Sequence, residues 1–515
     1  MFEKAAPILS SVGPANVSVT LTWRCSQAWT LVLKGRLDEA RSILEEACAE
    51  LARVRATAEG LDAFERARLT QQARHQDPHH LLASVEARSK NGEAAFRAIE
   101  SGRSRELLAL FDATRRSEST GPAERSSGVP LSEVASLQEV QAALGPREKM
   151  LIYSVGNADS VAILIGREQL VHWLPSMKGG RIPEHRWASL VEGYLDFVRL
   201  PPDAIAPRGG GDAIVGQGTA QSPARRGFEL FRALMPEEIW AQLREVDVLY
   251  VCPHGPLTSL PFEALIVAPG SDWPNAVYWL DVGPQIAYLP SASFLPRMVA
   301  PEPARADRRR FVVLGDPVSA EAALPGARLE IERIEKVVSR DERAVVESLT
   351  GSEATRARLF EAAEGAEILH LATHGRVARR GDTIEASLLL ASEPDSKVPG
   401  TLTLSDLLGD WRGRLSQSRL TMLSACETAR GERVRDEGQL ALPLGFQIAG
   451  CPRVVASYWP VADALATPDL MEHLYEGLME SDSTVLSSLV LAKRSLRKAR
   501  PHPFYWATFA LFGVR

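Results

Sequence analysis

The chain has 515 residues, of which 45% are hydrophobic and 24% are charged, and its formal net charge is −6. This length exceeds that of one ordinary domain, and the composition is that of a folded globular protein rather than a disordered or fibrous one. Nucleic-acid-binding proteins usually show a basic domain or stripe, so this charge balance gives no support for a direct nucleic-acid partner.

Cysteine usage and hydropathy bear on the compartment. The five cysteines include no Cys-x-x-Cys pair, which argues against a disulfide framework or a zinc ribbon and fits a reducing compartment. No stretch approaches about 18 uninterrupted apolar residues, and the start Met1-Phe2-Glu3-Lys4 lacks the features of a signal peptide. The Gly-rich segment 208–224 lacks the Gly-Lys-Ser/Thr ending of a phosphate loop. We therefore expect a cytoplasmic protein with no membrane partner, no metal and no other cofactor.

The amino-terminal part, residues 1–115, is predicted to be helical. Gly35, Ala40 and Ala47 have the spacing of small residues in a tetratricopeptide hairpin. One such repeat cannot bury its own apolar face, since about three are needed for an independent solenoid. Either these helices pack on the region that follows, or the chain begins inside a longer array.

A polar segment containing Gly and Pro, residues 116–135, is the predicted linker. Residues 136–305 are then expected to form a first α/β half without a catalytic pair. Cys252 and His254 lie at the end of a short apolar run with a rigid proline between them, so we interpret them as a turn motif. The predicted strands of this half are 150–155, 160–166 and 248–252, and its predicted helices are 186–199 and 226–243.

Residues 306–515 are expected to form a second α/β half. Strands that alternate with helices indicate a mainly parallel sheet with helices on both faces. The predicted strands are 311–315, the runs around His370 and Met422, and 454–459; the predicted helices are 328–338, 353–363, 440–448 and two around Leu470 and Leu489.

Two residues at the ends of apolar runs point to chemistry. His374 follows the run Ile368–Ala372, and Cys426 follows the run Leu420–Ala425, 52 residues later in the chain. Histidine followed by cysteine at about this interval is the chain order of caspase-type peptidases. A cysteine attacks as the thiolate, and a nearby imidazole both favours that form and later protonates the leaving amine.

The carboxyl ends of neighbouring parallel strands converge at one edge of a sheet, where α/β proteins generally bind ligands. His374 and Cys426 are therefore expected to meet there. The backbone N–H groups of Gly375 and Cys426 are the predicted oxyanion donors, because Gly375 has no Cβ to obstruct a substrate. His370 lies in the same strand about 13 Å from His374, too far to share one zinc ion, so we predict that it is a structural histidine.

Several motifs in a fixed order resemble one family. Together they are similar to the CHAT family, bacterial caspase-like proteins commonly joined to tetratricopeptide repeats, and the motif at 449–463 is also similar to separase, a eukaryotic relative. The likeness covers roughly residues 136 to 515. Its motifs are Pro253–Leu257, Leu260–Leu265, Gly315-Asp316-Pro317, Leu324–Arg328, His370–Gly375, Leu423–Thr428 with Gly431, and Ala449–Asp463.

The resemblance implies a caspase-like α/β fold made of a pseudo-half and a catalytic half, preceded by the helical region. It makes His374 the general base and acid and Cys426 the nucleophile. Separase-like members read a basic P1 residue with an acidic side chain after the last core strand, the place of Asp463 here, and a carboxylate suits that role because it pairs with Arg. Asp463 is equally well suited to be the N-cap of the helix that follows. Unlike caspases, the chain has no glycine two residues after Cys426.

The run 454–459 allows two interpretations. As an edge strand it would bind an extended substrate peptide, with Ser457, Tyr458 and Trp459 as substrate-binding residues. As a buried core strand it would have no direct role. The resemblance favours the first. The charged loop 430–438 is likewise either a solvated connection or a segment that moves on activation.

The sequence thus predicts a cysteine endopeptidase that cleaves a specific protein substrate, after Arg or Lys at P1. Its resemblance to guarded proteases implies regulation by an activating protein through the helical region, in bacterial defence or signalling. The alternative is a catalytically idle, caspase-like scaffold that acts as a protein-interaction module.

Overall fold

A computed structural model gives the fold of most of the chain. It describes residues 17–57, 77–120, 133–177, 180–202, 222–270, 275–299, 308–319, 321–380, 383–394, 396, 400–425, 428–429, 432–434, 438–460, 466–480 and 483–515. Cys426 and Asp463, two of the predicted site residues, lie outside the described residues.

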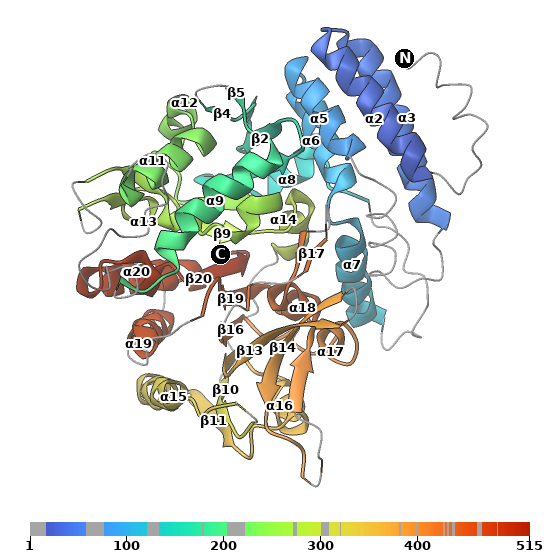
Figure 1. Cartoon of the computed structure of the whole chain (residues 1–515). Helices are drawn as coiled ribbons and strands as arrows, with labels where there is room; N and C mark the ends of the chain where they lie inside the picture. The colour runs from blue at the N-terminus through green and yellow to red at the C-terminus, as the bar shows by residue number, and fades with distance from the viewer. Residues whose placement is uncertain are drawn as a thin grey trace.

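Within the described residues, eleven strands form one central sheet, seen through the middle of Figure 1. Nearly all of its inner strands are buried on both faces, which explains why they appear in the sequence as continuous apolar runs. Across the sheet the strands are β11 (Ala344–Gly351), β10 (Arg309–Pro317), β12 (Ile368–Ala372), β16 (Leu420–Ser424), β19 (Arg453–Ser457), β20 (Phe509–Gly513), β9 (Gln285–Tyr288), β6 (Val248–Cys252), β1 (Glu148–Val155), β2 (Ser160–Ile165) and β3 (Leu170–Trp173).

The sheet has two halves that run in opposite directions. Strands β11, β10, β12, β16 and β19 are parallel to one another, and so are β20, β9, β6 and β1. The halves join where β19 pairs antiparallel with β20, with Ser457 opposite Phe509. The mainly parallel α/β fold predicted from the sequence is confirmed.

Small ribbons lie outside the sheet: β13 (Gly375–Arg380) with β14 (Thr383–Leu390) and β15 (Gly400–Thr403), β17 (Glu432–Val434) with β18 (Gly438–Leu440), β4 (Ser176–Met177) with β5 (Gly180–Arg181), and β7 (Ile266–Ala268) with β8 (Val277–Tyr278).

Helices flank this sheet. One predicted helix, 226–243, is instead two, because Pro236 lacks a backbone N–H and restricts the residue before it. The first half carries α8 (Leu137–Ala143), α9 (Glu184–Val198), α11 (Pro223–Leu234), α12 (Glu237–Ala241), α13 (Trp279–Val282) and α14 (Leu295–Met298), with the 3-10 turns η2 (Gly255–Ser259), η3 (Phe262–Ala264) and η4 (Ala292–Phe294). The second half carries α15 (Pro325–Val338), α16 (Arg356–Ala363), α17 (Leu404–Leu408), α18 (Leu442–Ile448), α19 (Ala466–Met479), α20 (Val485–Ala499) and α21 (Pro503–Trp506).

The amino-terminal region is helical, as predicted, and begins with an antiparallel helix pair. Its helices are α2 (Val17–Leu33), α3 (Leu37–Thr57), α5 (Pro78–Arg88), α6 (Gly92–Gly102) and α7 (Arg105–Thr120). Gly35 makes the turn between α2 and α3 with φ +75°, and Ala40 and Ala47 are fully buried between the helices. Helix α7 extends to Thr120, into the segment that we assigned to the linker, because no Gly or Pro interrupts the chain before Gly121.

Helices α5 and α6 pack on the first α/β half, α2 and α3 pack on α5, and α7 also contacts α18 of the second half (Figure 1). The buried carboxylate of Asp159, beside β2, accepts a hydrogen bond of 2.7 Å from Ser84 of α5 and lies 3.2 Å from Nε2 of His80. Glu100 of α6 accepts hydrogen bonds from the backbone N–H and the hydroxyl of Ser293, at 2.9 and 2.6 Å. Buried charged contacts of this kind fix an orientation, so the helical region is held in one place on the α/β part.

In the described parts of the chain, no helix is both long and apolar enough to cross a membrane. The same residues contain no group of three or more His, Cys, Asp or Glu side chains arranged to hold a metal ion.

Candidate active site

His374 lies at the turn between β12 and β13, directly after a central strand of the sheet. The turn is fixed on both sides of the histidine: the hydroxyl of Thr373 donates to the carbonyl of Leu389 at 2.5 Å, and the N–H of Leu389 donates to the carbonyl of His374 at 2.9 Å. The imidazole is half-buried. A fixed backbone and a partly exposed ring are what a group that must meet a substrate requires.

Among the described residues, the imidazole has one hydrogen-bond partner. Its Nε2 lies 2.8 Å from the carbonyl oxygen of Ala322, in the segment between β10 and α15. Because a carbonyl only accepts hydrogen bonds, Nε2 carries the proton and Nδ1 of the neutral ring carries the lone pair. Ala322 is therefore an orienting group that sequence reasoning missed, and no residue signature points to it, since every residue has a backbone carbonyl.

The strand that leads to Cys426 runs beside the strand that leads to His374. In the parallel pair β12–β16, Ala372 is opposite Ser424, the last pair of the ladder. His374 and Cys426 each come two residues after these partners in the sequence. The register therefore brings the ends of these two adjacent strands, at Ala372 and Ser424, to the same edge of the sheet.

Ser457, at the end of β19, holds the chain on both sides of the Cys426 position. Its hydroxyl donates to the carbonyl of Ala425, and its backbone N–H donates to the hydroxyl of Thr428 at 3.0 Å. Its carbonyl accepts from the N–H of Ala429 at 2.8 Å. These contacts connect the predicted nucleophile segment to a central strand of the sheet.

A buried polar network lies beneath these strand ends. Nε2 of His370 is 3.0 Å from Oε1 of Glu330 in α15, and its Nδ1 is 3.1 Å from the hydroxyl of Tyr475 in α19. The hydroxyl of Ser424 donates to Oε2 of Glu330 at 3.0 Å. Burial and the nearby carboxylate of Glu330 raise the pKa of Tyr475 well above its ordinary value. The prediction that His370 is a structural histidine is confirmed.

The predicted substrate-binding strand is not an edge. Strand β19 has β16 on one side and β20 on the other, so the edge-strand interpretation of 454–459 is wrong and the core-strand interpretation is right. The reason is non-local, because its second partner is a strand about 50 residues further along the chain. The side chains of Ser457, Tyr458 and Trp459 are all buried. Their assignment to substrate binding, and that of Gly375 to the oxyanion site, stays a prediction.

The second Cys and His pair has structural roles. Cys252 is fully buried, and burial raises the pKa of its thiol, which disfavours the thiolate. Nδ1 of His254 accepts a hydrogen bond of 3.0 Å from the N–H of Val155. The turn-motif interpretation of these two residues is therefore confirmed.

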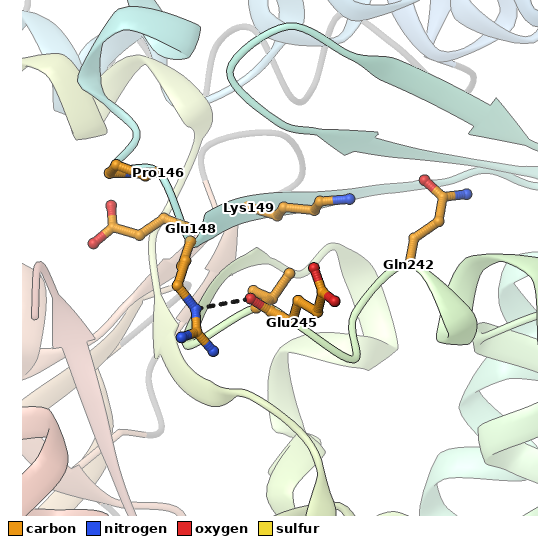
Figure 2. Close-up of a pocket in the computed structure, with 7 residues that line it drawn as sticks. Pro146, Glu148, Lys149, Gln242 and Glu245 are labelled. Atoms are coloured by element: carbon orange, nitrogen blue, oxygen red, sulfur yellow. Dashed lines mark hydrogen bonds between the residues drawn. The ribbon is translucent and has the colours of Figure 1, made fainter.

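A cavity of about 540 Å³ lies in the first half, at the start of β1 (Figure 2). Arg147 donates from Nε to the carbonyl of Glu245 at 3.1 Å across it, the contact that is dashed in Figure 2. None of its lining residues is a predicted site residue, and they include no cysteine or histidine. The lining residues are Pro146, Arg147, Glu148, Lys149, Gln242, Glu245 and Val246.

The two-part, mainly parallel sheet, with a histidine at the end of one central strand and a helical region before it, defines a caspase-like α/β protein. The chain belongs to the CHAT-domain family, whose model, described as "CHAT domain", matches residues 224–514. Among curated proteins, it is 30% identical over 197 residues to tetratricopeptide repeat protein 28 of Mus musculus, an alignment that covers 32% of this chain and 8% of that protein.

A solved structure supports the fold. The chain resembles separase in the Saccharomyces cerevisiae separase-securin complex, with a TM-score of 0.53 and 9% identity over 96% of this chain and 40% of separase. It also aligns with the Arg-specific cysteine proteinase gingipain R, with a TM-score of 0.36 and 10% identity over 64% of this chain and 74% of that chain. The chain thus spans less than half of the separase chain and a small part of the mouse relative.

Proposed function

We propose that the protein is a cysteine endopeptidase in which His374 and Cys426 form the catalytic dyad. The observation that carries the proposal is the position and tautomer of His374. It follows a central strand that pairs in register with the strand leading to Cys426. The contact of its Nε2 with the carbonyl of Ala322 leaves Nδ1 as the basic nitrogen. Family membership and the separase-like fold support the same class of chemistry.

The chemistry follows from this arrangement. Nδ1 of His374 takes the thiol proton of Cys426, and the thiolate attacks the scissile carbonyl carbon. The backbone N–H groups of Gly375 and Cys426 stabilise the oxyanion of the tetrahedral intermediate. The imidazolium then protonates the leaving amine as the C–N bond breaks. Water, deprotonated by the same imidazole, releases the acyl group from sulfur.

The substrate we propose is a specific protein cut after Arg or Lys. The sequence similarity of the segment around Asp463 to separase supports a basic P1 residue, and a carboxylate gives a guanidinium a charge-assisted, often bidentate contact. We further propose a cytoplasmic protein, controlled by an activating protein that binds the helical region and serving bacterial defence or signalling. Because α5 and α6 contact the first half directly, a partner bound to these helices would act on the α/β part through them.

The direct test uses fluorogenic peptides that end in Arg before the reporter, with the full chain and its Cys426→Ala variant. We expect turnover and labelling by an arginyl electrophile in the first protein and neither in the second. Labelling that persists in the Cys426→Ala protein would disprove the assigned nucleophile. A protein that neither cleaves nor is labelled, even with a partner bound to its helices, would support the scaffold alternative.

Specificity has its own prediction. Asp463→Ala should lower kcat/KM for Arg substrates. The loss should correspond to roughly 2–5 kcal/mol of transition-state stabilisation, because a buried substrate cation would lose its partner. The measurement is kcat/KM for matched Arg and norleucine peptides, whose ratio should collapse. The control is Asp469→Ala, which removes a carboxylate six residues later in the sequence, whose partner is Arg333 at 2.6 Å. An unchanged ratio in the Asp463→Ala protein would mean that Asp463 only caps the following helix.

A further inference from the structure

Asp316, at the end of β10, has an unusual backbone. Its φ is +45°, in the left-handed region that residues with a Cβ rarely adopt, and its side chain is buried. Such a conformation is unfavourable and persists only where surrounding contacts impose it. Strain of this kind at the end of a central strand, next to a candidate active site, needs a cause.

The cause is visible in the contacts of its carboxylate. Oδ1 accepts a hydrogen bond of 2.6 Å from the backbone N–H of Leu324, and Oδ2 pairs with Nε of Arg328 in α15. Leu324 precedes α15 and gives that helix no side-chain cap, so Asp316 supplies an acceptor there. We call these contacts the Asp316–Arg328 clamp. It joins the two sequence motifs Gly315-Asp316-Pro317 and Leu324–Arg328.

Next to the clamp, α15 packs closely against the end of β10 at Gly315. A Cβ at Gly315 would lie 2.1 Å from Cδ1 of Ile331, a distance that real atoms do not reach. A side chain at this position would have to displace the end of the Ile331 side chain. The clamp thus joins the two ends of the segment between β10 and α15.

This segment carries Ala322, whose carbonyl oxygen holds Nε2 of His374 at 2.8 Å. A second contact ties it to the turn after His374: Oε1 of Glu321 pairs with Nη2 of Arg376 at 2.5 Å. The clamp closes the base of the segment, and the Glu321 pair fixes its far side. The position of the Ala322 carbonyl therefore depends on Asp316.

We propose that Asp316, with Arg328, is a positioning residue for the catalytic histidine: it places the Ala322 carbonyl that selects the tautomer and orientation of His374. This inference rests on the proposed peptidase function. Asp316 acts through another group and does not touch the substrate. A purely structural cap would give the same contacts, so the test must read the state of His374 itself.

The variants separate the parts of the clamp. Asp316→Asn keeps a residue that tolerates positive φ and an oxygen for Leu324, but its amide nitrogen faces the guanidinium of Arg328. Arg328→Ala removes the other partner, and Asp316→Ala removes both contacts. The matched control is Arg333→Ala on the same helix, which breaks the ion pairs with Asp469 and Glu472 and leaves the clamp intact.

The first measurement is kinetic and uses the full chain. Since a small misplacement of a catalytic group is costly, kcat should fall about tenfold or more in Asp316→Asn, and further in Asp316→Ala, with KM nearly unchanged. Arg333→Ala should keep the original kcat. All variants should be compared at temperatures well below their unfolding midpoints. Equal kcat in Asp316→Ala and Arg333→Ala would overturn the proposal.

The second measurement does not need peptidase activity. In protein with ¹⁵N-labelled histidines, of which there are ten, the His374 signal is assigned by its loss in His374→Gln. We expect the Nε2–H tautomer in the original chain and in Arg333→Ala, and a mixture of tautomers in Asp316→Asn. A changed His374 tautomer in Asp316→Asn, with no turnover by the original chain, would keep the link between Asp316 and His374 and reject the peptidase. Turnover by the original chain, with an unchanged tautomer in Asp316→Asn, would keep the peptidase and overturn this inference.

Discussion

The His374→Ala protein should hydrolyse its substrate about 10²–10⁴-fold more slowly than the original chain, because one imidazole serves as both base and acid. The same change should alter the chemistry of Cys426. Without an imidazolium beside it, the thiol pKa should return toward its free value of about 8.5. Alkylation by iodoacetamide should therefore slow below about pH 8 and recover above it, and its rate as a function of pH is the measurement.

A matched histidine is available as the control. His473 lies exposed on α19, where its Nδ1 is 2.6 Å from the carbonyl of Asp469, away from the turn that holds His374. His473→Ala should leave both turnover and the alkylation profile unchanged. If the profile of His374→Ala coincided with that of His473→Ala, the imidazole of His374 would not act on Cys426 and the dyad would be rejected.

Replacing Lys493 by methionine should lower the free energy of unfolding by about 3–5 kcal/mol, the usual cost of leaving one partner of a buried ion pair alone. Nζ of Lys493, in α20, lies 3.0 Å from Oε1 of Glu263, in η3, and both side chains are buried. Oε2 of Glu263 accepts a hydrogen bond of 2.8 Å from Tyr288. The pair thus connects a helix of the second half to the first half, and urea unfolding measures the loss.

A double-mutant cycle isolates the pair. Glu263→Gln combined with Lys493→Met should recover part of the loss, because no charge is then left buried without a partner. The control is Arg232→Met, which breaks an exposed pair with Glu237 and should cost less than about 1 kcal/mol. A Lys493→Met protein as stable as that control would mean that the contact contributes nothing to holding the two halves together.

Much of the fold could be predicted because the central strands are buried on both faces. Such strands appear as unbroken apolar runs, as around His370 and Met422, and neither run needs a partner to be recognised. The position of β20 could not be found in this way. The run Phe509–Gly513 is short, and nothing local shows that it pairs with β19 rather than with another strand. That missing pairing produced the wrong edge-strand expectation.

The candidate site likewise contains residues that can be recognised in the sequence and groups that only the structure reveals. His374 and Cys426 are recognisable because their side chains carry the chemistry and their strands end where chemistry is expected. Ala322 acts through its backbone and leaves no mark in the sequence. Asp316 stands in a motif that the resemblance singled out. Its proposed role, however, depends on two backbone groups, the N–H of Leu324 and the carbonyl of Ala322. Groups that work through backbone atoms need a structure to be seen.

The place of β20 also has a consequence for synthesis. It is the last strand of the sheet to leave the ribosome, yet it lies between the two halves and pairs with both. Until then β19 and β9 each present an unpaired edge, which in a nascent chain is a site for contact with chaperones. The two halves can join only after β20 has been translated. A growing chain therefore cannot complete this sheet early.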